Sequence, residues 1–260
     1  MIPAAVSPAQ AAPGEPARLT VMTQNLYLGS SLQPAIDAEN AEEFLIAVAT
    51  IYGTSVVTDF PSRAQVIAQA IADEKPDLIG LQEVTKWTAV RSDGGPALPN
   101  YDFLEILLAA LEAEGLNYLV AGTVDNASIS APLINPALEC LGEFPAFDCN
   151  VTLMDRDAIL VNGDSGIGIA PDSLTTGRFT AQASLQTPLG ARSFDRGWLY
   201  VDMEYMGRDF RFANTHLEVE SYTRIQRRQA REFIRVVQVD RPGPVIAAGD
   251  FNSAADGSNT

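Results

Sequence analysis

The chain has 260 residues, of which 47% are hydrophobic, so it is long enough to bury a sizeable core. This composition excludes a disordered, collagen-like or coiled-coil protein, and no apolar run approaches the ~18 residues that a membrane-spanning helix needs. The formal net charge is −16, and only Lys75 and Lys86 of the cationic side chains are lysines. Because nucleic-acid affinity rests largely on cations that neutralise phosphates, this charge opposes tight non-specific binding to DNA, but it leaves hydrolysis of phosphate esters open.

The N-terminal segment differs from the rest of the chain. Residues 1–17 are rich in Ala and Pro, nearly uncharged and without periodicity, and Ala9 to Ala11 have the small-x-small form of a signal-peptidase site. No basic segment or long apolar core precedes that site. We therefore interpret residues 1–17 as a disordered lead-in or a signal-peptide remnant, and residues 18–260 as one domain, since no linker or repeat divides them.

Cys140 and Cys149 are the only cysteines, and the chain has a single His, which is too few ligands for a thiolate metal site. A bridge between them would close about ten residues and contribute roughly 2.7 kcal/mol by the loop-entropy formula. We predict this disulfide, with two free thiols as the alternative. Disulfides are typical of oxidising compartments, so a secreted or periplasmic protein is expected.

The first half of the chain predicts helices mixed with short strands. Ser62 is the expected N-cap of the second helix, and Pro76 ends that helix. A long surface insertion is expected where three prolines and both cysteines gather. The predicted elements are a strand at 18–25, helices at 41–51 and 62–73, a buried strand at 77–82, a helix at 102–113, a strand at 117–122 and the insertion at 125–150.

The second half reads mainly as strands. They are predicted at 151–161, 179–186, 198–205, 210–215 and 245–248, with one amphipathic helix at 223–239. Together the two halves predict a layered α/β protein built around a sheet core.

Four polar clusters follow directly after apolar strands, which is where layered α/β proteins place their sites. They are Gln24-Asn25, Gln82-Glu83, Asn214-Thr215-His216 and the segment 249–252, which carries Asp250 and Asn252. Together they supply one Glu, one Asp, one His and several amides. Such a set suits a hard divalent cation bound by oxygen ligands, with the His and the Asp left for proton and phosphate work.

Four segments carry a resemblance to a known family: TQNLYLG at 23–29, PDLIGLQEV at 76–84, NTHLE at 214–218 and GDFNS at 249–253. In this order the chain resembles the endonuclease/exonuclease/phosphatase superfamily, which has the deoxyribonuclease I-like fold. With DRDAILV at 155–161, it looks most like exported bacterial members. The resemblance implies an α/β fold in four layers, two packed β-sheets flanked by helices.

The resemblance also implies roles for individual residues. Glu83 matches the metal-binding glutamate, and Asn25 matches the amide that helps to hold the metal and the phosphate. His216 matches the histidine that contacts the phosphate or protonates the leaving oxygen. Asp250 and Asn252 match the pair that orients the attacking water and the phosphoryl oxygens. Water is then expected to attack phosphorus in line, with catalysis by positioning and electrostatics.

Two further side chains are candidate phosphate contacts. Asn214 lies two residues before His216 in the NTHLE segment, and Arg196 stands in the sequence DRGW. For Arg196 an ordinary surface ion pair is the alternative.

One family motif has no counterpart in this sequence. Family members end with a strand that carries a Ser-Asp-His-type motif, whose histidine is a general base paired with a carboxylate. Here the sequence ends at Thr260, eight residues after Asn252, and holds one His. We expect either a piece of a longer protein that lacks the last strands, or a degenerate member that does not turn over normally.

The function expected from the sequence is a Mg²⁺-dependent phosphoester hydrolase, with Mn²⁺ or Ca²⁺ as alternative cations. A phosphodiesterase, either a nuclease or a phospholipid phosphodiesterase, is favoured over a phosphatase. The expected substrates are nucleic acid, a phospholipid or a small phosphodiester, and the expected state is a monomer. The alternative is a non-catalytic relic of the same fold that binds a phosphorylated ligand or a partner protein.

Overall fold

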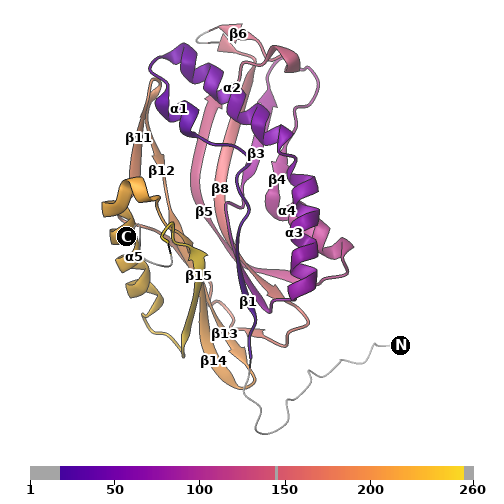
Figure 1. Cartoon of the computed structure of the whole chain (residues 1–260), viewed down its shortest axis with the longest axis vertical. Helices are drawn as coiled ribbons and strands as arrows, with labels where there is room; N and C mark the ends of the chain where they lie inside the picture. Colours follow the sequence, from indigo (N-terminus) through magenta and orange to yellow (C-terminus); the bar gives the residue numbers. More distant parts are fainter. Residues whose placement is uncertain (1–17, 144–145, 255–260) are drawn as a thin grey trace.

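The computed structural model describes residues 18–143 and 146–254, so the predicted lead-in at 1–17 lies outside the described residues. Two β-sheets pack face to face (Figure 1). Helices α2, α3 and α4 cover the outer face of one sheet, and α5 covers the outer face of the other. The described helices are α1 (Gln33–Asp37), α2 (Ala41–Val57), α3 (Phe60–Glu74), α4 (Phe103–Ala113) and α5 (Thr223–Val237), with short 3₁₀ helices at Pro136–Leu138 and Glu220–Tyr222.

The first sheet has the strand order β1-β2-β8-β3-β4, with β5 paired to β8. The pair β1–β2 is parallel and the other pairs are antiparallel. Its strands are β1 (Val21–Asn25), β2 (Leu78–Gln82), β3 (Lys86–Arg91), β4 (Tyr101–Asp102), β5 (Tyr118–Pro132) and β8 (Cys149–Asn162).

The second sheet has the order β10-β13-β14-β15, with β9 paired to β13, and its pair β14–β15 is parallel. Its strands are β9 (Gly168–Ile169), β10 (Thr175–Arg178), β13 (Gly197–Tyr205), β14 (Arg208–His216) and β15 (Val245–Asp250). Two hairpins stand apart from both sheets: β6 (Gly142–Glu143) with β7 (Ala146–Phe147), and β11 (Ala183–Thr187) with β12 (Gly190–Phe194).

Three apolar interfaces hold the four layers together. Successive residues of a strand point to opposite faces, so neighbours enter different cores. Leu160 packs under α2, α3 and α4, whereas Ile159 packs between the sheets. Phe212 also packs between the sheets, and Ala213 packs under α5 against Phe233. Because both faces of β2 and of the second half of β14 are covered, these segments are buried throughout, and the predicted four-layer α/β sandwich is confirmed.

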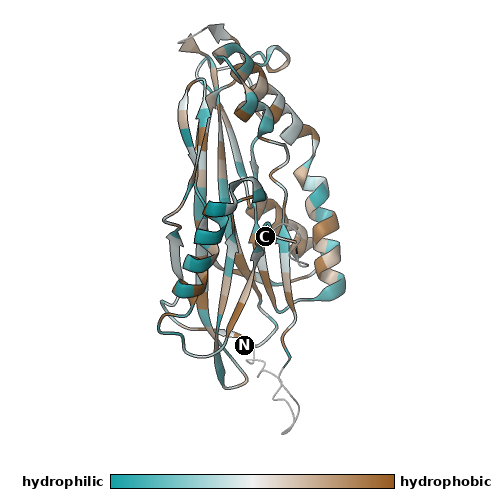
Figure 2. Cartoon of the chain, turned by 60° about the vertical axis from the view of Figure 1, so that its left-hand side comes forward, coloured by the Kyte–Doolittle hydropathy of each residue, from teal (hydrophilic) through white to brown (hydrophobic). Residues whose placement is uncertain are grey.

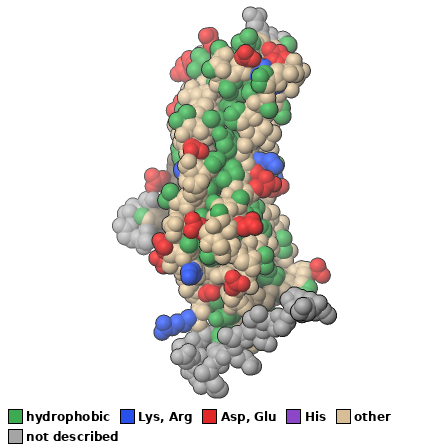
Figure 3. All heavy atoms as spheres, turned by 90° about the vertical axis from the view of Figure 1, so that its right-hand side faces the viewer, with side chains coloured by type: hydrophobic (Ala, Val, Ile, Leu, Met, Phe, Trp, Pro, Cys, Tyr) green, Lys and Arg blue, Asp and Glu red, His purple; other side chains and the backbone are tan. Residues whose placement is uncertain are grey.

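The surface reflects the composition. Acidic side chains are spread over the face shown in Figure 3, where Lys and Arg are few, and α5 shows a hydrophilic outer side in Figure 2. No single helix in the described part of the chain is long and apolar enough to cross a membrane. Only α2 and α3 taken together reach that length and composition, and they are bent by 48°.

Three predictions of local structure were wrong. Ser62 is not the N-cap of helix α3, because the helix begins at Phe60 and Asp59 is its N-cap residue. Ser62 lies inside the first turn, and so does Pro61, which a first turn tolerates. The predicted insertion at 125–150 is mostly strand: β5 continues to Pro132 after a bulge between Asp125 and Ser128, which breaks the alternation of its side chains. Residues 179–182 precede the hairpin strand β11 rather than forming a strand.

The predicted disulfide is confirmed. Cys140 and Cys149 are bonded, both are fully buried, and the bridge ties the 133–148 connection to the start of β8.

Candidate active site

The predicted site residues meet where four strands end. β1 and β2 run parallel in one sheet, with Asn25 opposite Gln82, and β14 and β15 run parallel in the other, with His216 opposite Asp250. The two pairs face each other, because β15 lies against both β1 and β2. The carboxyl ends of the four strands therefore come together at one place between the sheets.

Asn25 joins the two acidic side chains of this site. Its Nδ2 donates to Glu83 Oε1 and to Asp250 Oδ2, each at 3.0 Å. Glu83 directly follows β2 and has a positive φ of 51°, which turns its carboxylate back toward β1. There its Oε2 accepts a 2.6 Å hydrogen bond from the backbone N–H of Leu28. The sequence-based grouping of these three residues therefore corresponds to one connected set of contacts.

The loop after β1 is fixed by two side chains that sequence reasoning missed. Arg63 donates from Nη1 to Leu26 O at 2.6 Å and from Nη2 to Tyr27 O at 3.1 Å. Trp87 donates from Nε1 to Leu28 O at 2.8 Å. Arg63 lies in a predicted helix and Trp87 in β3, a strand that was not predicted, and nothing in their local sequence signals this contact.

His216 is 2% exposed and has a nitrogen neighbour at each ring nitrogen. Arg196 Nη1 lies 2.9 Å from Nδ1, and Asn252 Nδ2 lies 3.0 Å from Nε2. Asp250 Oδ2 is 3.7 Å from Nε2. Burial, and to a lesser degree the charge of Arg196, lowers the pKa of His216 well below its ordinary value. The imidazole is therefore neutral in the folded protein at neutral pH.

The turn after β15 places Asp250 and Asn252. A Cβ at Gly249 would lie 2.4 Å from the carbonyl oxygen of Thr215, so only glycine lets β15 approach β14 here. The backbone N–H of Asn252 donates to Asp250 Oδ1 at 2.9 Å, and its Nδ2 donates to Leu217 O at 2.9 Å. From α5, Gln226 donates to Asn252 O at 2.8 Å. These bonds hold both side chains toward Asn25 and His216.

Asn214 lies deeper, between the two sheets, and is fully buried. Its Nδ2 donates to Leu81 O and to Ala158 O, each at 2.9 Å, and its Oδ1 accepts from Gln82 Nε2 at 2.7 Å. The structure thus gives this predicted phosphate contact a complete set of partners inside the protein. It holds the sheets together beneath the site.

Arg196 is also buried, and it contacts the ring nitrogen of His216 opposite to the one that Asn252 contacts. Its guanidinium lies 3.8 Å from Asp155 Oδ2 and stacks on the Phe194 ring, with its carbon 4.9 Å from the ring centroid. Asn126 Nδ2 donates to the same Asp155 oxygen at 3.2 Å. The neighbouring Asp157 is fully buried, and neither of its carboxyl oxygens has a hydrogen-bond partner in the described part of the chain.

Both buried aspartates of this cluster have perturbed pKa values. Burial raises the pKa of Asp155 to about 6, against the opposing effect of Arg196. Burial, and then the charge of Asp155, raise the pKa of Asp157 well above its ordinary value. Two carboxyl groups that share this interior therefore favour their protonated forms more than exposed carboxyl groups do.

The residues at the mouth of the site fit a divalent cation. The carboxylates of Glu83 and Asp250 accept from one amide nitrogen, so their nearest oxygens lie within about 6 Å of each other. Within residues 18–143 and 146–254, neither carboxylate forms an ion pair with a Lys or Arg. No cluster of three or more His, Cys, Asp or Glu side chains in those segments forms a metal cage. Mg²⁺ needs none, because it binds through one or two carboxylates and keeps several waters.

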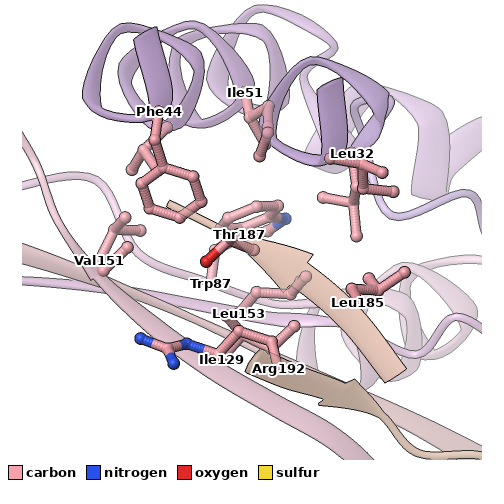
Figure 4. A pocket seen from close by; sticks show the side chains of 14 residues that line it. Leu32, Phe44, Ile51, Trp87, Ile129, Val151, Leu153, Leu185, Thr187 and Arg192 are labelled. Atoms are coloured by element: carbon pink, nitrogen blue, oxygen red, sulfur yellow. The ribbon is translucent and has the colours of Figure 1, made fainter. Parts of the chain in front are cut away.

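A separate cavity of about 80 Å³ lies beneath α1 and α2 (Figure 4). Phe44, Trp87 and Leu185 are among the side chains that line it, and Thr187 and Arg192 are the polar residues at its wall. No Asp, Glu or His of the described chain lines this cavity, so it lacks the groups that phosphoryl chemistry requires.

The fold and the convergent carboxylate, amide and imidazole groups define an α/β sandwich with a polar site at the carboxyl ends of paired parallel strands. The chain belongs to the endonuclease/exonuclease/phosphatase family, whose model matches residues 22–260. Its fold is the deoxyribonuclease I-like sandwich, and the family predicted from the four sequence segments is confirmed.

Solved structures of low identity are similar to the chain. Humanised D. rerio TDP2 is 13% identical, with a TM-score of 0.45, over 91% of this chain and 63% of that one. An endonuclease/exonuclease/phosphatase from Bacteroides vulgatus is 15% identical, with a TM-score of 0.45, over 90% and 65%. A mannosyl-6-phosphatase from Bacteroides thetaiotaomicron is 19% identical, with a TM-score of 0.42, over 77% and 60%.

The chain therefore spans about three fifths of the length of these three solved structures. No curated protein sequence matches it significantly.

Proposed function

We propose that this protein is a Mg²⁺-dependent phosphoester hydrolase, and specifically a phosphodiesterase. The observation that supports the proposal most strongly is the convergence of Asn25, Glu83, His216, Asp250 and Asn252, from four separate segments, into one hydrogen-bonded group. Family membership agrees with it. Phosphoryl transfer depends mainly on positioning and on charge stabilisation, and these are the functions such a group performs.

Glu83 and Asn25 would hold the cation, which supplies positive charge for the phosphoryl oxygens when bound. Asp250, fixed by Asn25 and by the Asn252 backbone, accepts a hydrogen bond from the attacking water and orients it. His216 and Asn252 face the phosphoryl oxygens. The water oxygen bonds to phosphorus as the ester P–O bond breaks. One water proton ends on the leaving oxygen and the other is released to solvent.

The substrate class stays broad: nucleic acid, a phospholipid or a small phosphodiester. The net charge of −16 favours a substrate that is not a long polyanion, because the field of the protein repels one. The buried disulfide supports export to an oxidising compartment, secreted or periplasmic. We further propose that the protein acts as a monomer.

The test is hydrolysis of bis(p-nitrophenyl) phosphate by the full chain with Mg²⁺. Turnover should stop when EDTA is added and return with excess Mg²⁺. Glu83→Gln removes the charge at the cation site and should lower kcat at least ~100-fold, the scale on which single transition-state contacts act. Glu112→Gln, the same change at an exposed position of α4, is the matched control and should leave kcat unchanged. Metal-independent hydrolysis, or no hydrolysis by the wild-type chain, would contradict the proposal.

A further inference from the structure

The hydrogen bond between Arg196 and His216 determines where the imidazole proton lies. A guanidinium has five N–H donors, no acceptor, and stays protonated at all relevant pH values. Since Arg196 Nη1 is 2.9 Å from His216 Nδ1, that ring nitrogen must accept. A neutral imidazole has one acceptor and one donor nitrogen, so the proton of neutral His216 is on Nε2.

The other neighbour of the ring would favour the opposite tautomer. Asn252 Nδ2 lies 3.0 Å from Nε2 and also 2.9 Å from Leu217 O. The bond to a carbonyl oxygen requires the nitrogen of the amide, and not its oxygen, at this position. Asn252 therefore presents a second N–H group toward Nε2. Without Arg196, that group would draw the imidazole proton to Nδ1.

With Arg196 in place, two N–H donors, His216 Nε2–H and Asn252 Nδ2–H, point into one small space. Asp250 Oδ2 lies 3.7 Å from Nε2, which is too long for a good hydrogen bond. An anionic oxygen entering from the solvent side would accept from both donors.

Buried contacts fix the guanidinium in this orientation. Asp155 Oδ2 is 3.8 Å away as counter-ion, and the Phe194 ring packs against one face of the guanidinium. Asn126 donates to the same Asp155 oxygen. Arg196 is 6% exposed, and its Nε has no hydrogen-bond partner among the described residues, whereas its Nη1 contacts His216.

We propose that Arg196 is a positioning residue that locks His216 in the Nε2–H tautomer, so that His216 acts in the phosphoryl reaction only as a neutral hydrogen-bond donor. The role of His216 in catalysis rests on the proposed function, whereas its tautomer follows from the contact with Arg196. The tautomer decides between the two roles expected for His216, contact with a phosphoryl oxygen and protonation of the leaving oxygen. A neutral donor stabilises a phosphoryl oxygen, whereas protonating the leaving oxygen would need an imidazolium ion. The charged groups that face the ring are Arg196 and Asp250, with Asp155 behind Arg196.

Because His216 is the only histidine, its ring nitrogens can be observed without assignment work. A long-range ¹H–¹⁵N spectrum of the ¹⁵N-labelled chain should show one protonated and one unprotonated imidazole nitrogen. The proton should be on Nε2, with no change between about pH 6 and pH 8. This measurement needs neither Mg²⁺ nor turnover, so its failure and a failure of the proposed function are distinguishable.

Three variants complete the test. Arg196→Met removes the donor and the charge, and should shift the proton to Nδ1 or give averaged nitrogen signals, with a higher pKa for His216. Arg196→Lys keeps a charged donor and should restore the wild-type pattern. Arg192→Met is the matched control and should change nothing, because Arg192 lies in β12, four residues before Arg196, and its Nη1 donates to the carbonyl oxygen of its neighbour Ala191. A backbone ¹H–¹⁵N spectrum checks that each variant is folded.

An Nδ1–H tautomer in the wild-type chain would overturn the proposal. So would imidazole signals and a pKa that are the same in folded Arg196→Met as in the wild type.

Discussion

Asn25 and Asp250 are 225 positions apart in the chain, yet the Asn25 amide donates to the Asp250 carboxylate at 3.0 Å. Through the same nitrogen Asn25 also holds Glu83, so a single neutral side chain separates two negative charges. This arrangement is stable only while the central group is a donor. A substitution that makes residue 25 negatively charged would therefore place three negative charges side by side.

Asn25→Asp should therefore destabilise the protein when no divalent cation is present. The change removes a donor from two carboxylates and adds a third negative charge, at a cost of about 1–3 kcal/mol in the free energy of unfolding. Mg²⁺ should recover more stability in this variant than in the wild type, because three carboxylates attract it more strongly. Urea unfolding with and without Mg²⁺ measures both effects. Asn150→Asp, at an exposed position, is the control.

Gly80 permits the sheets to approach beneath the site, since a Cβ there would lie 2.8 Å from Asn214 Oδ1 and 2.9 Å from the Ala248 side chain. Gly80→Ala should lower the free energy of unfolding by about 1–3 kcal/mol through overpacking. Gly53 in α2 has no atom within 4 Å of such a Cβ, so Gly53→Ala should instead stabilise by about 0.5–1 kcal/mol. Chemical denaturation of both variants compares them. Equal effects would show that the inter-sheet contact is not tight.

Reducing the Cys140–Cys149 bridge should cost about 2–5 kcal/mol of stability. The effect should be largest in the 133–148 connection, which the bridge ties to β8. Hydrogen exchange of backbone amides in oxidised and reduced protein should locate the loss there. The double variant Cys140→Ser/Cys149→Ser should behave like the reduced protein. Loss of protection spread over both sheets would contradict a local role for the bridge.

The buried Asp155 should make stability depend on pH. Burial raises its pKa to about 6 in the folded protein, so between about pH 4 and pH 6 the folded state binds more protons than the unfolded state. Its contribution to the free energy of unfolding therefore falls as pH rises through this range, by about 3 kcal/mol. Asp155→Asn should gain stability relative to the wild type over the same range. Urea titrations at several pH values measure that difference, and a constant difference would refute the assignment.

Local patterns in the sequence predicted strands that are followed by polar clusters, and the resemblance to the family implied the four layers. The apolar run of β2 and the polar pair Gln82-Glu83 after it are adjacent in sequence, as are β15 and Asp250. The pairing partners were not predictable, and neither was the length of β5. Its bulge between Asp125 and Ser128 interrupts the alternation on which strand prediction depends.

The supporting residues of the site were beyond sequence reasoning for a different reason. Arg63 lies in an amphipathic helix and Asp155 in a long strand, and each acts on residues more than 30 positions away. Arg196 was predicted as a phosphate contact, and that role stays a prediction. Its burial against His216 depends on the packing of β12 and β13, which no local pattern encodes.

The distribution of the site over the chain has a consequence for synthesis on the ribosome. Asn25 and Glu83 belong to the part made first, whereas Asp250 and Asn252 come at the end of β15 and just after it. A nascent chain that has completed the first sheet therefore holds the proposed cation ligands without the residues that are proposed to act on the attacking water and the phosphate. Domains can begin to fold while they are being translated, N-terminal parts first. The proposed site can therefore be completed only after β15 and Asn252 have emerged from the ribosome.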